Sequence, residues 1–255
     1  MAKEEKIRLK LATLPTLTER GFQPILEVFC SILHKYDLQP IDTLEKKSIK
    51  PLSEGVEKPF LKGFFKPFKM EKCEKICLSH CMLMDSILVS ALIIIPDDDY
   101  ELPLLLLEWS ETGSAISILV DFLPMVDLVM REDYREKYLD PMNQYWTKYK
   151  SLPGMEPNRF AWARQMFSPY YLSGSISKES EKNKEDCIEI INNYLELWIS
   201  LWQKAEPIKD GNAKEYIRER KTNIRKIFRA NDEGAKTMAQ MVGQEIIDLL
   251  LLCNF

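Results

Sequence analysis

The stretch that decides the fold is residues 86–129, which read SILVSALIIIPDDDYELPLLLLEWSETGSAISILVDFLPMVDLV. Three nearly uninterrupted apolar runs cover Ile87–Ile95, Leu102–Leu107 and Ala115–Phe122, with breaks rich in Pro, Asp, Gly and Ser between them. Apolar runs of this length, bounded by turn residues, are typical of buried strands. The breaks suit hairpins and are too short for parallel crossovers, so the runs predict an antiparallel meander that is covered on both faces.

Glu108 interrupts this apolar pattern at the end of the run LPLLLL. A carboxylate at the end of a buried strand is costly unless it is paired, hydrogen-bonded or protonated. A carboxyl group that stays protonated near neutral pH can act as a proton donor, which makes Glu108 the first functional candidate. The alternative is a strand-end side chain that simply reaches solvent.

Asp121 is the nearest acidic residue on the following strand. A turn centred on Gly113 places Glu108 opposite Ile116 and Asp121 opposite Pro103, roughly 16 Å apart along the strands at about 3.3 Å per residue. We therefore expect the carboxyl partner of Glu108 to come from elsewhere in the chain.

Composition narrows the possible functions. The 255 residues contain no stretch rich in Gly, Pro or Ser that would mark a boundary, which predicts a single domain, 1–255. The net charge of −4 argues against nucleic acid as the main ligand. Two histidines, His34 and His80, leave little for zinc or a histidine-based triad. No Walker loop, GxGxxG or metal-ligand motif occurs, so we expect no metal and no bound cofactor.

Apolar runs too short for a membrane span predict a protein that is not in the membrane. The first residues, MAKEEKIRLKL, lack the apolar run of a secretory signal and contain acidic residues that transit peptides avoid. We expect a cytoplasmic protein, or a stromal one if a plastid transit peptide has been removed. Six cysteines are too few for a disulfide scaffold, which indicates a reducing compartment.

Cys73, Cys77 and Cys81 are spaced four residues apart, which places all three on one face of a helix or a strand. They could bind a metal or an iron–sulfur cluster, but usual cluster spacings are tighter and a fourth ligand is missing. Buried cysteines that act as small apolar side chains are the favoured interpretation.

Helical patterns flank the predicted strands. One covers residues 17–37, a second runs from Ser177 to about Pro207, a third spans 212–230, and a last one covers Met238–Leu252. The third is strongly basic, with Lys214, Arg218, Arg220, Lys221, Arg225, Lys226 and Arg229, and such an excess of one sign would steer an acidic partner.

Two charged residues stand out in these flanking regions. Arg164 lies in the aromatic stretch 159–176 and is predicted to need an anionic partner, either a structural carboxylate or a ligand carboxylate. Asp232 lies at the junction between the last two helices, where capping a helix is the simplest role.

Together these stretches resemble the ferredoxin-dependent bilin reductase superfamily, most closely its red chlorophyll catabolite reductase branch. Pro96 followed by YELP (100–103) is similar to the family's entry into a strand, and the acidic residue five positions after the second proline is Glu108. VDFLPMVDLVMREDY (120–134), ARQMFSPYYL (163–172) and Asn231-Asp232 with a later glycine, Gly243, are similar to further family motifs. The resemblance covers about residues 85–172 and 222–250.

The resemblance implies an α/β fold, a three-layer α/β/α sandwich with a central, mostly antiparallel sheet and helices on both faces. It also implies a pigment site between the sheet and the C-terminal helices, where Glu108 and Asp232 donate protons; alignment to the chlorophyll-catabolite branch could shift the second acid to Glu233. Electrons would come from reduced ferredoxin, an acidic partner, and the substrate would be a linear tetrapyrrole. The substrate-binding residues would be Ser117, Arg164, Phe167, Arg225, Arg229 and Asn231. Dimers occur in that branch, so a homodimer is one expected state.

One position departs from the family pattern. Biliverdin reducers carry a catalytic histidine on the first of the three strands, and the register from Pro96 places Ala91 there. This departure favours the chlorophyll-catabolite branch, and it leaves open a non-catalytic tetrapyrrole carrier on the same fold.

Overall fold

The computed structural model describes residues 35–36, 38–41, 61–83, 86–232, 235–236, 239–240 and 244. Most of the predicted helix at 17–37, including His34, most of the predicted last helix, and Glu233 lie outside this description. No helix in the part of the chain that is described is long and apolar enough to cross a membrane.

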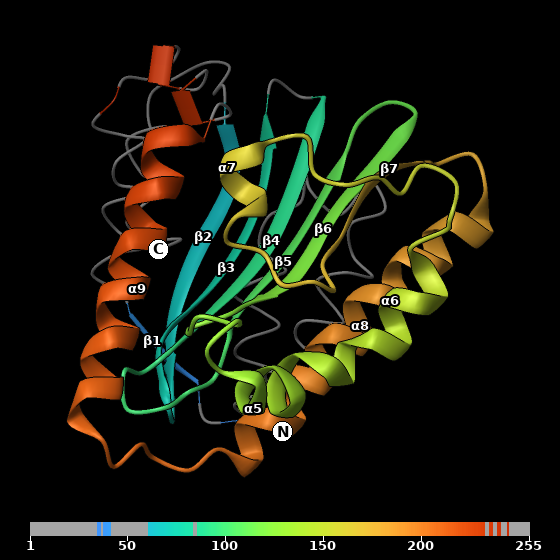
Figure 1. The fold of residues 1–255 in the computed structure, drawn as a ribbon. Helices are drawn as coiled ribbons and strands as arrows, with labels where there is room; N and C mark the ends of the chain where they lie inside the picture. The colour runs from blue at the N-terminus through green and yellow to red at the C-terminus, as the bar shows by residue number, and fades with distance from the viewer. Residues whose placement is uncertain are drawn as a thin grey trace.

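A seven-stranded antiparallel sheet forms the centre of the molecule, and its strands follow one another in chain order (Figure 1). The predicted meander is confirmed as β4 (Ile87–Pro96), β5 (Leu104–Glu111) and β6 (Ala115–Leu123). On either side the sheet continues into strands that the sequence analysis did not assign: β1 (Gln39–Pro40), β2 (Leu61–Met70), β3 (Cys73–Leu83) and β7 (Leu172–Ser177).

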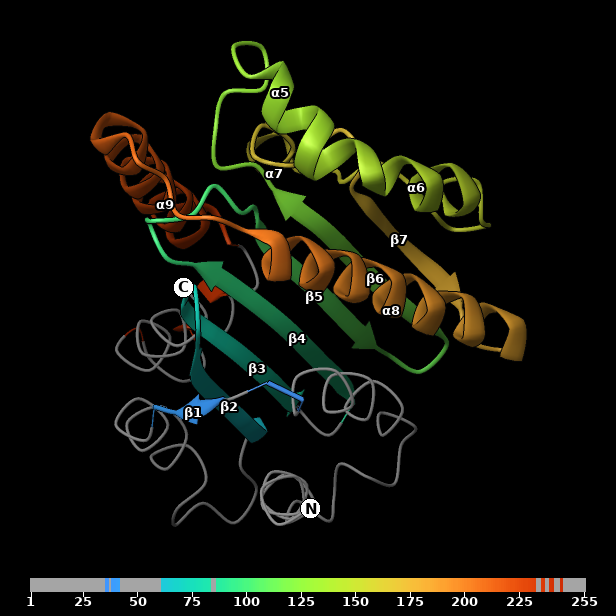
Figure 2. The same cartoon turned by 90° about the horizontal axis from the view of Figure 1, so that it is seen from below.

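Helices cover both faces of the sheet, as predicted. α8 (Glu181–Lys204) packs on β5 and β6, and Figure 2 shows it crossing the strands. On the same face lie α5 (Glu132–Tyr134), a π-helical segment (Arg135–Leu139), a 3₁₀ turn (Asp140–Met142) and α6 (Asn143–Tyr149), whose buried aromatic and apolar residues share one core with α8. The other face carries α7 (Ala161–Arg164) and α9 (Gly211–Asn231).

Alternating residues of each strand point to these two faces. On β6, Ile118, Val120 and Phe122 belong to the core under α8, whereas Leu119 and Leu123 pack with α7 and α9. The α8 core is the larger and contains Trp198, whose indole Nε1–H donates to the Pro103 carbonyl at 2.9 Å across the interface.

The β5–β6 register differs from the prediction. Glu108 lies opposite Leu119, and Asp121 lies opposite Leu106, because the hairpin is closed by the Thr112 N–H to Ala115 carbonyl bond around Gly113 and Ser114. The two residues are thus diagonal neighbours on the same face, at positions about 7–8 Å and not 16 Å apart. The predicted distance between Glu108 and Asp121 is wrong. Glu108 is also in the interior of β5 and not at its end.

The face assignment of the three cysteines is also corrected. Cys73, Cys77 and Cys81 are all buried on β3, but a register shift between Cys73 and Lys75 turns Cys73 to the α8 core and leaves the other two outside that cluster. Strand geometry places Cys77 and Cys81 about 13 Å apart, too far for one metal ion. Within the described ranges, no three His, Cys, Asp or Glu residues are grouped to bind a metal ion.

Candidate functional site

A cavity of about 470 Å³ lies on the α9 face of the sheet. Its floor comes from β5, β6 and β7, and its walls come from the segment 156–160, from α7 and from the C-terminal end of α9. The residues that line it are Glu108, Ser117, Ile118, Leu119, Glu156, Pro157, Asn158, Arg159, Phe160, Trp162, Ala163, Phe167, Ser173, Gly174, Ser175, Phe228 and Asp232. Four residues predicted from the sequence are among them: Glu108, Ser117, Phe167 and Asp232.

Glu108 enters the cavity from the middle of the sheet, between Ala91 of β4 and Leu119 of β6. It is only partly exposed to solvent, and its cross-strand neighbours offer no cation or hydrogen-bond donor from their side chains. Burial, followed by the negative charge of Asp232, raises the pKa of Glu108 to about 7. A substantial fraction of this carboxyl is therefore protonated at neutral pH.

Asp232 lies on the opposite wall and is held by the turn that ends α9. Its N–H donates to the Phe228 carbonyl at 2.9 Å, and its Oδ1 accepts the N–H of Ala235 at 2.9 Å. The capping role proposed from sequence is confirmed, and Asp232 lines the cavity as well. The cavity therefore brings together two acids that lie 124 residues apart in the chain.

Aromatic rings form the outer wall of the cavity. Phe160 and Trp162 stack with centroids 6.0 Å apart, and Trp162 meets Phe228 of α9 edge to face at 5.6 Å. Phe167 completes this wall and is buried. Such a set of ring faces suits a flat, conjugated ligand.

Hydroxyl groups and one guanidinium group lie at the β6–β7 side of the cavity. Ser117 and Ser175 are within hydrogen-bond distance of each other, with 3.3 Å between their Oγ atoms, and the Ser173 Oγ–H donates to the Glu156 carbonyl at 2.7 Å. The guanidinium of Arg159 lies over the ring of Phe160, 4.7 Å from its centroid. Arg159 was not predicted as a site residue; its only signal in the sequence is its place directly before the aromatic run FAW.

The remaining predicted binding residues do not line the cavity. Arg164 is exposed and donates to the Asn158 carbonyl at 2.7 Å, so among the described residues its partner is a backbone carbonyl and not the structural carboxylate that was one of its two predicted partners. Arg225 pairs with Glu74 at 2.5 Å, Asn231 donates to the Ile227 carbonyl at 2.9 Å, and Arg229 is exposed.

The basic character of α9 is largely neutralised by the acidic β4–β5 turn and by β3. Lys214 pairs with Asp99 at 2.7 Å, and Arg218 pairs with Asp98 at 3.0 Å. Lys221 is 3% exposed and contacts Glu74, Asp98 and the Pro96 carbonyl. Burial alone would raise the pKa of Glu74, but Lys221 and Arg225 hold it below its ordinary value. These ion pairs hold α9, and with it Asp232, against the sheet.

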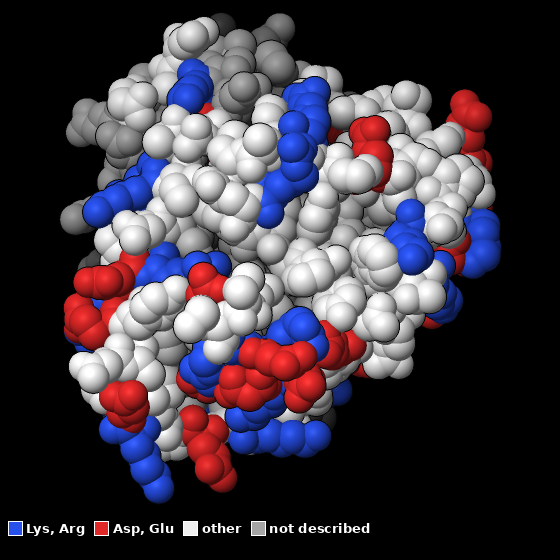
Figure 3. Space-filling view, in the orientation of Figure 1, with Lys and Arg blue, Asp and Glu red and all other residues white. Residues whose placement is uncertain are grey.

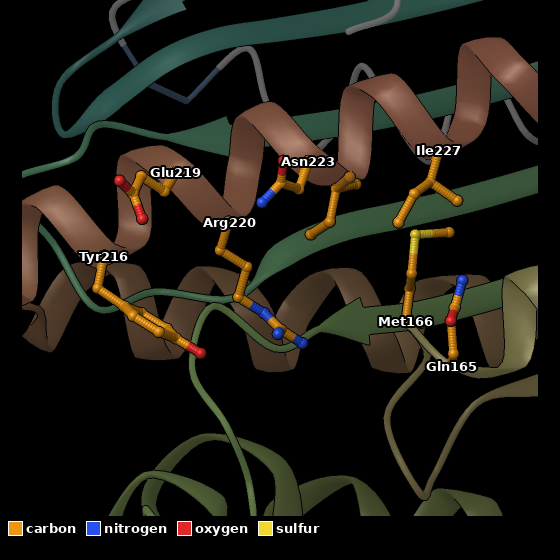
Figure 4. A pocket seen from close by; sticks show the side chains of 8 residues that line it. Gln165, Met166, Tyr216, Glu219, Arg220, Asn223 and Ile227 are labelled. Atoms are coloured by element: carbon orange, nitrogen blue, oxygen red, sulfur yellow. The ribbon is translucent and has the colours of Figure 1, made fainter.

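A second cavity, of about 260 Å³, lies between α9 and the segment after α7 (Figure 4). Arg220 points into it and donates from Nε to the Pro124 carbonyl at 2.6 Å, while Glu219 points away from Arg220. Met166 and Gln165 close the opposite side. This cavity does not bring two acids together, so the larger cavity is the candidate site.

Comparison with known proteins identifies relatives of this chain. Residues 64–251 match the family model described as ferredoxin-dependent bilin reductase. Over 144 residues the chain is 26% identical to 15,16-dihydrobiliverdin:ferredoxin oxidoreductase of Nostoc punctiforme, a match that covers 56% of this chain and 57% of that protein. The match thus spans little more than half the length of this relative.

A solved structure gives the same result for the fold. The crystal structure of phytochromobilin synthase from tomato in complex with biliverdin superposes with a TM-score of 0.75 and 19% identity, covering 92% of this chain and 83% of that one. Because the family model spans well over half of the sequence, the chain belongs to the ferredoxin-dependent bilin reductase family.

Proposed function

We propose that this protein reduces a linear tetrapyrrole in the larger cavity, with electrons supplied by reduced ferredoxin. The observation that carries this proposal is that Glu108 and Asp232 line one cavity that also has a wall of aromatic rings. The family model and the Nostoc relative both concern bilins, so a bilin is the first substrate to test and a red chlorophyll catabolite the second.

The reaction requires two electrons and two protons for each double bond that is reduced. Two reduced ferredoxins each lose one electron, and the pigment gains both. Glu108 donates one proton, since its pKa of about 7 keeps it partly protonated at neutral pH. Asp232 donates the second proton from the opposite wall, and both carboxylates regain protons from solvent after turnover.

Binding of the pigment uses the aromatic and hydroxyl parts of the cavity. The pyrrole rings lie against Phe160, Trp162 and Phe167, and the propionates are bound by Arg159 with Ser117. In this proposal Arg159 takes the role that the sequence analysis gave to Arg164, Arg225 and Arg229, because only Arg159 lines the cavity.

Ferredoxin docks near the cavity mouth in this proposal, and not along α9. Four of the seven basic residues predicted to steer it are ion-paired. Among the residues that the structure describes, Arg159, Arg164 and Arg229 form no ion pair, and Figure 3 shows mostly basic side chains beside α7 and both signs mixed below. An acidic ferredoxin would meet this surface in a small, salt-sensitive encounter.

The deciding experiment is anaerobic absorbance of the protein with biliverdin, and separately with a red chlorophyll catabolite, before and after reduced ferredoxin is added. We expect bound pigment to change to a reduced product only when ferredoxin is present. Glu108→Gln should lower turnover at least about 100-fold, the usual size of a lost general acid, and leave the pigment Kd within about threefold. The matched control is Glu111→Gln on the same strand, which should turn over normally. Full activity of Glu108→Gln would refute its role.

A non-catalytic carrier is the second candidate. It is favoured by Ala91, which pairs with Glu108 across β4 and β5 at the position where the resembling biliverdin reducers carry histidine, and which is 8% exposed. A pigment that binds with a fixed spectrum, whatever the supply of reduced ferredoxin, would favour the carrier.

A further inference from the structure

A second buried carboxyl group lies on the α9 face of the sheet, outside the cavity. Asp121 of β6 is 0% exposed, and both of its carboxyl oxygens accept hydrogen bonds from one residue: Oδ2 from the Ser168 N–H at 2.9 Å and Oδ1 from the Ser168 Oγ–H at 2.5 Å. Ser168 is itself 2% exposed. Asp121 forms no ion pair with any residue in the described ranges, and burial raises its pKa to about 7.

Asp121 would be an expensive choice for packing alone. An apolar side chain fills a fully buried strand position at no desolvation cost, whereas a carboxyl group without a cation must recover that cost through hydrogen bonds. Here the two hydrogen bonds from Ser168 fix one point of the segment after α7. We therefore expect the buried Asp121 carboxyl to serve the residues that this segment places beside the cavities.

The segment fixed by Asp121 contributes residues to both cavities. Phe167, immediately before Ser168, lines the larger cavity, and Met166 lines the smaller one opposite α9 (Figure 4). The Ser168 Oγ also accepts the Tyr170 N–H at 3.1 Å, so the turn after Phe167 is closed by the same hydroxyl. Loss of the Ser168 contact would release the segment at this buried polar anchor.

The anchor extends to the segment that carries Arg159. The ring of Tyr171 packs on Phe167 with centroids 5.0 Å apart, and its hydroxyl accepts the Asn158 N–H at 3.1 Å. Through these two contacts the position of Ser168 is transmitted to the residue next to Arg159. The buried Asp121–Ser168 pair is thus connected by these contacts to Phe167 in the aromatic wall and to the segment that carries the Arg159 guanidinium.

We propose that Asp121 is a positioning residue of the pigment cavity, which sets the placement of Phe167 and of the Arg159 segment through its two hydrogen bonds to Ser168. This inference rests on the proposed function for its effect on pigment. The anchor itself can be measured in the free protein.

The experiment compares Ser168→Ala and Ser168→Thr in the full chain. Ser168→Ala removes the Oγ donor and should raise the pigment Kd and KM by up to about tenfold, because the free energy of the lost hydrogen bond is the most that this anchor can contribute to binding, with kcat at saturation within about threefold of wild type. The absorbance band of the bound pigment should broaden, because the ring against Phe167 is less constrained. Ser168→Thr keeps the hydroxyl and should restore both values. Asp121→Asn, which cannot accept both bonds, should behave like Ser168→Ala.

The matched control is Ser90→Ala. Ser90 is also 0% exposed and its Oγ lies 2.5 Å from His80 Nδ1, but it belongs to the opposite face. Ser90→Ala should lower stability and leave the pigment spectrum unchanged. If Ser168→Ala did the same, the residue pair would be merely structural and the proposal would be overturned.

Hydrogen exchange of the free protein separates this inference from the proposed function. The amides of 158–160 and 167–171 should exchange faster in Ser168→Ala than in wild type, while those of β4 should not change. Unchanged exchange in both segments would overturn the anchor whatever the pigment does. Absence of pigment binding by the wild type, together with faster exchange in the variant, would refute the proposed function and retain the anchor.

Discussion

The two faces of the sheet are built from the same strands and differ in almost everything else. The α8 face is covered by a continuous apolar core, in which Tyr194 and Trp198 are 0% exposed. On the α9 face the apolar cluster is smaller and is interrupted by Glu108, Asp121 and Ser117. Neighbouring residues of a strand point to opposite faces. The residues that face α8 can therefore stabilise the fold, while the residues that face α9 can carry the polar groups of a site.

The two long helices show the same contrast. α8 buries a full stripe of apolar residues, whereas α9 buries only Ile217, Lys221 and Ile224 and is held largely by ion pairs. Exposed and half-exposed ion pairs contribute little free energy of unfolding compared with buried aromatic rings. We infer that the α8 face contributes most of the free energy of unfolding and that the α9 face is the less stable part, as ligand sites commonly are.

The largest difference is expected between two tryptophans, one on each face. Trp198→Ala should lower the free energy of unfolding by about 3–5 kcal/mol, because it empties a fully buried position and leaves the Pro103 carbonyl without its donor. Trp162→Ala on the α9 face should cost about 1 kcal/mol, since Trp162 is only partly buried, yet it should weaken pigment binding more. Urea denaturation and pigment titration of both variants measure these effects. Equal losses of stability would contradict the division between the faces.

A smaller effect is expected for the ion pairs of α9. Lys221→Met should lower the free energy of unfolding by about 1–3 kcal/mol, less than for a fully buried pair, because Arg225 and Arg218 still partner Glu74 and Asp98. Turnover should also fall, since α9 carries Asp232. Lys226→Met, at an exposed position of the same helix, is the control and should change stability by less than about 0.5 kcal/mol. A variant as stable as wild type would show that the ion pairs do not hold α9.

The pH dependence of stability should come mainly from the α9 face. Glu108 and Asp121 have pKa values raised to about 7, so in the folded state they keep protons that the unfolded chain releases near pH 4. Their contribution to stability therefore falls as the pH rises from about 4 to about 7. Glu108→Gln cannot ionise and should be more stable than wild type at pH 8 by about 1–3 kcal/mol, with no gain at pH 4. Denaturation midpoints at both pH values test this, and Glu111→Gln should follow the wild type.

The sequence predicts the strands with long apolar runs better than the strand that is rich in Ser and Gly. Long runs such as Ile87–Ile95 identify β4 from composition alone, and the apolar stripe of α8 is equally plain. β7, which reads LSGSIS, gave no such signal. It is a strand because it pairs with β6, and its Gly174 lies against Gly154, where a Cβ would come within 2.5 Å of the Gly154 carbonyl oxygen. That close approach depends on a segment 20 residues away and cannot be read locally.

The candidate site shows the same limit. Glu108 was found because a charge in an apolar run is visible in sequence, and Asp232 because the resemblance pointed to it. Arg159 was missed, since its direction depends on the Asn158 to Tyr171 contact and on the β7 edge. The distance between Glu108 and Asp121 failed for a related reason: a hairpin register depends on which hydrogen bond closes the turn, and composition does not specify it.

The smallest effect on stability should come from Ser117→Ala, and it tests the comparison most sharply. Within the described ranges, the Ser117 hydroxyl forms one hydrogen bond, to the Ser175 hydroxyl at 3.3 Å on a side open to solvent, so its loss should change the free energy of unfolding by less than about 0.5 kcal/mol. If this hydroxyl binds a propionate, the pigment Kd should still rise about three- to tenfold. Ser110→Ala, at the paired position of β5, is the control and should change neither quantity. A residue that serves ligand binding alone should change the pigment Kd and not the free energy of unfolding. A loss of stability in Ser117→Ala without a loss of affinity would therefore show that Ser117 stabilises the fold, as the residues of the α8 face do.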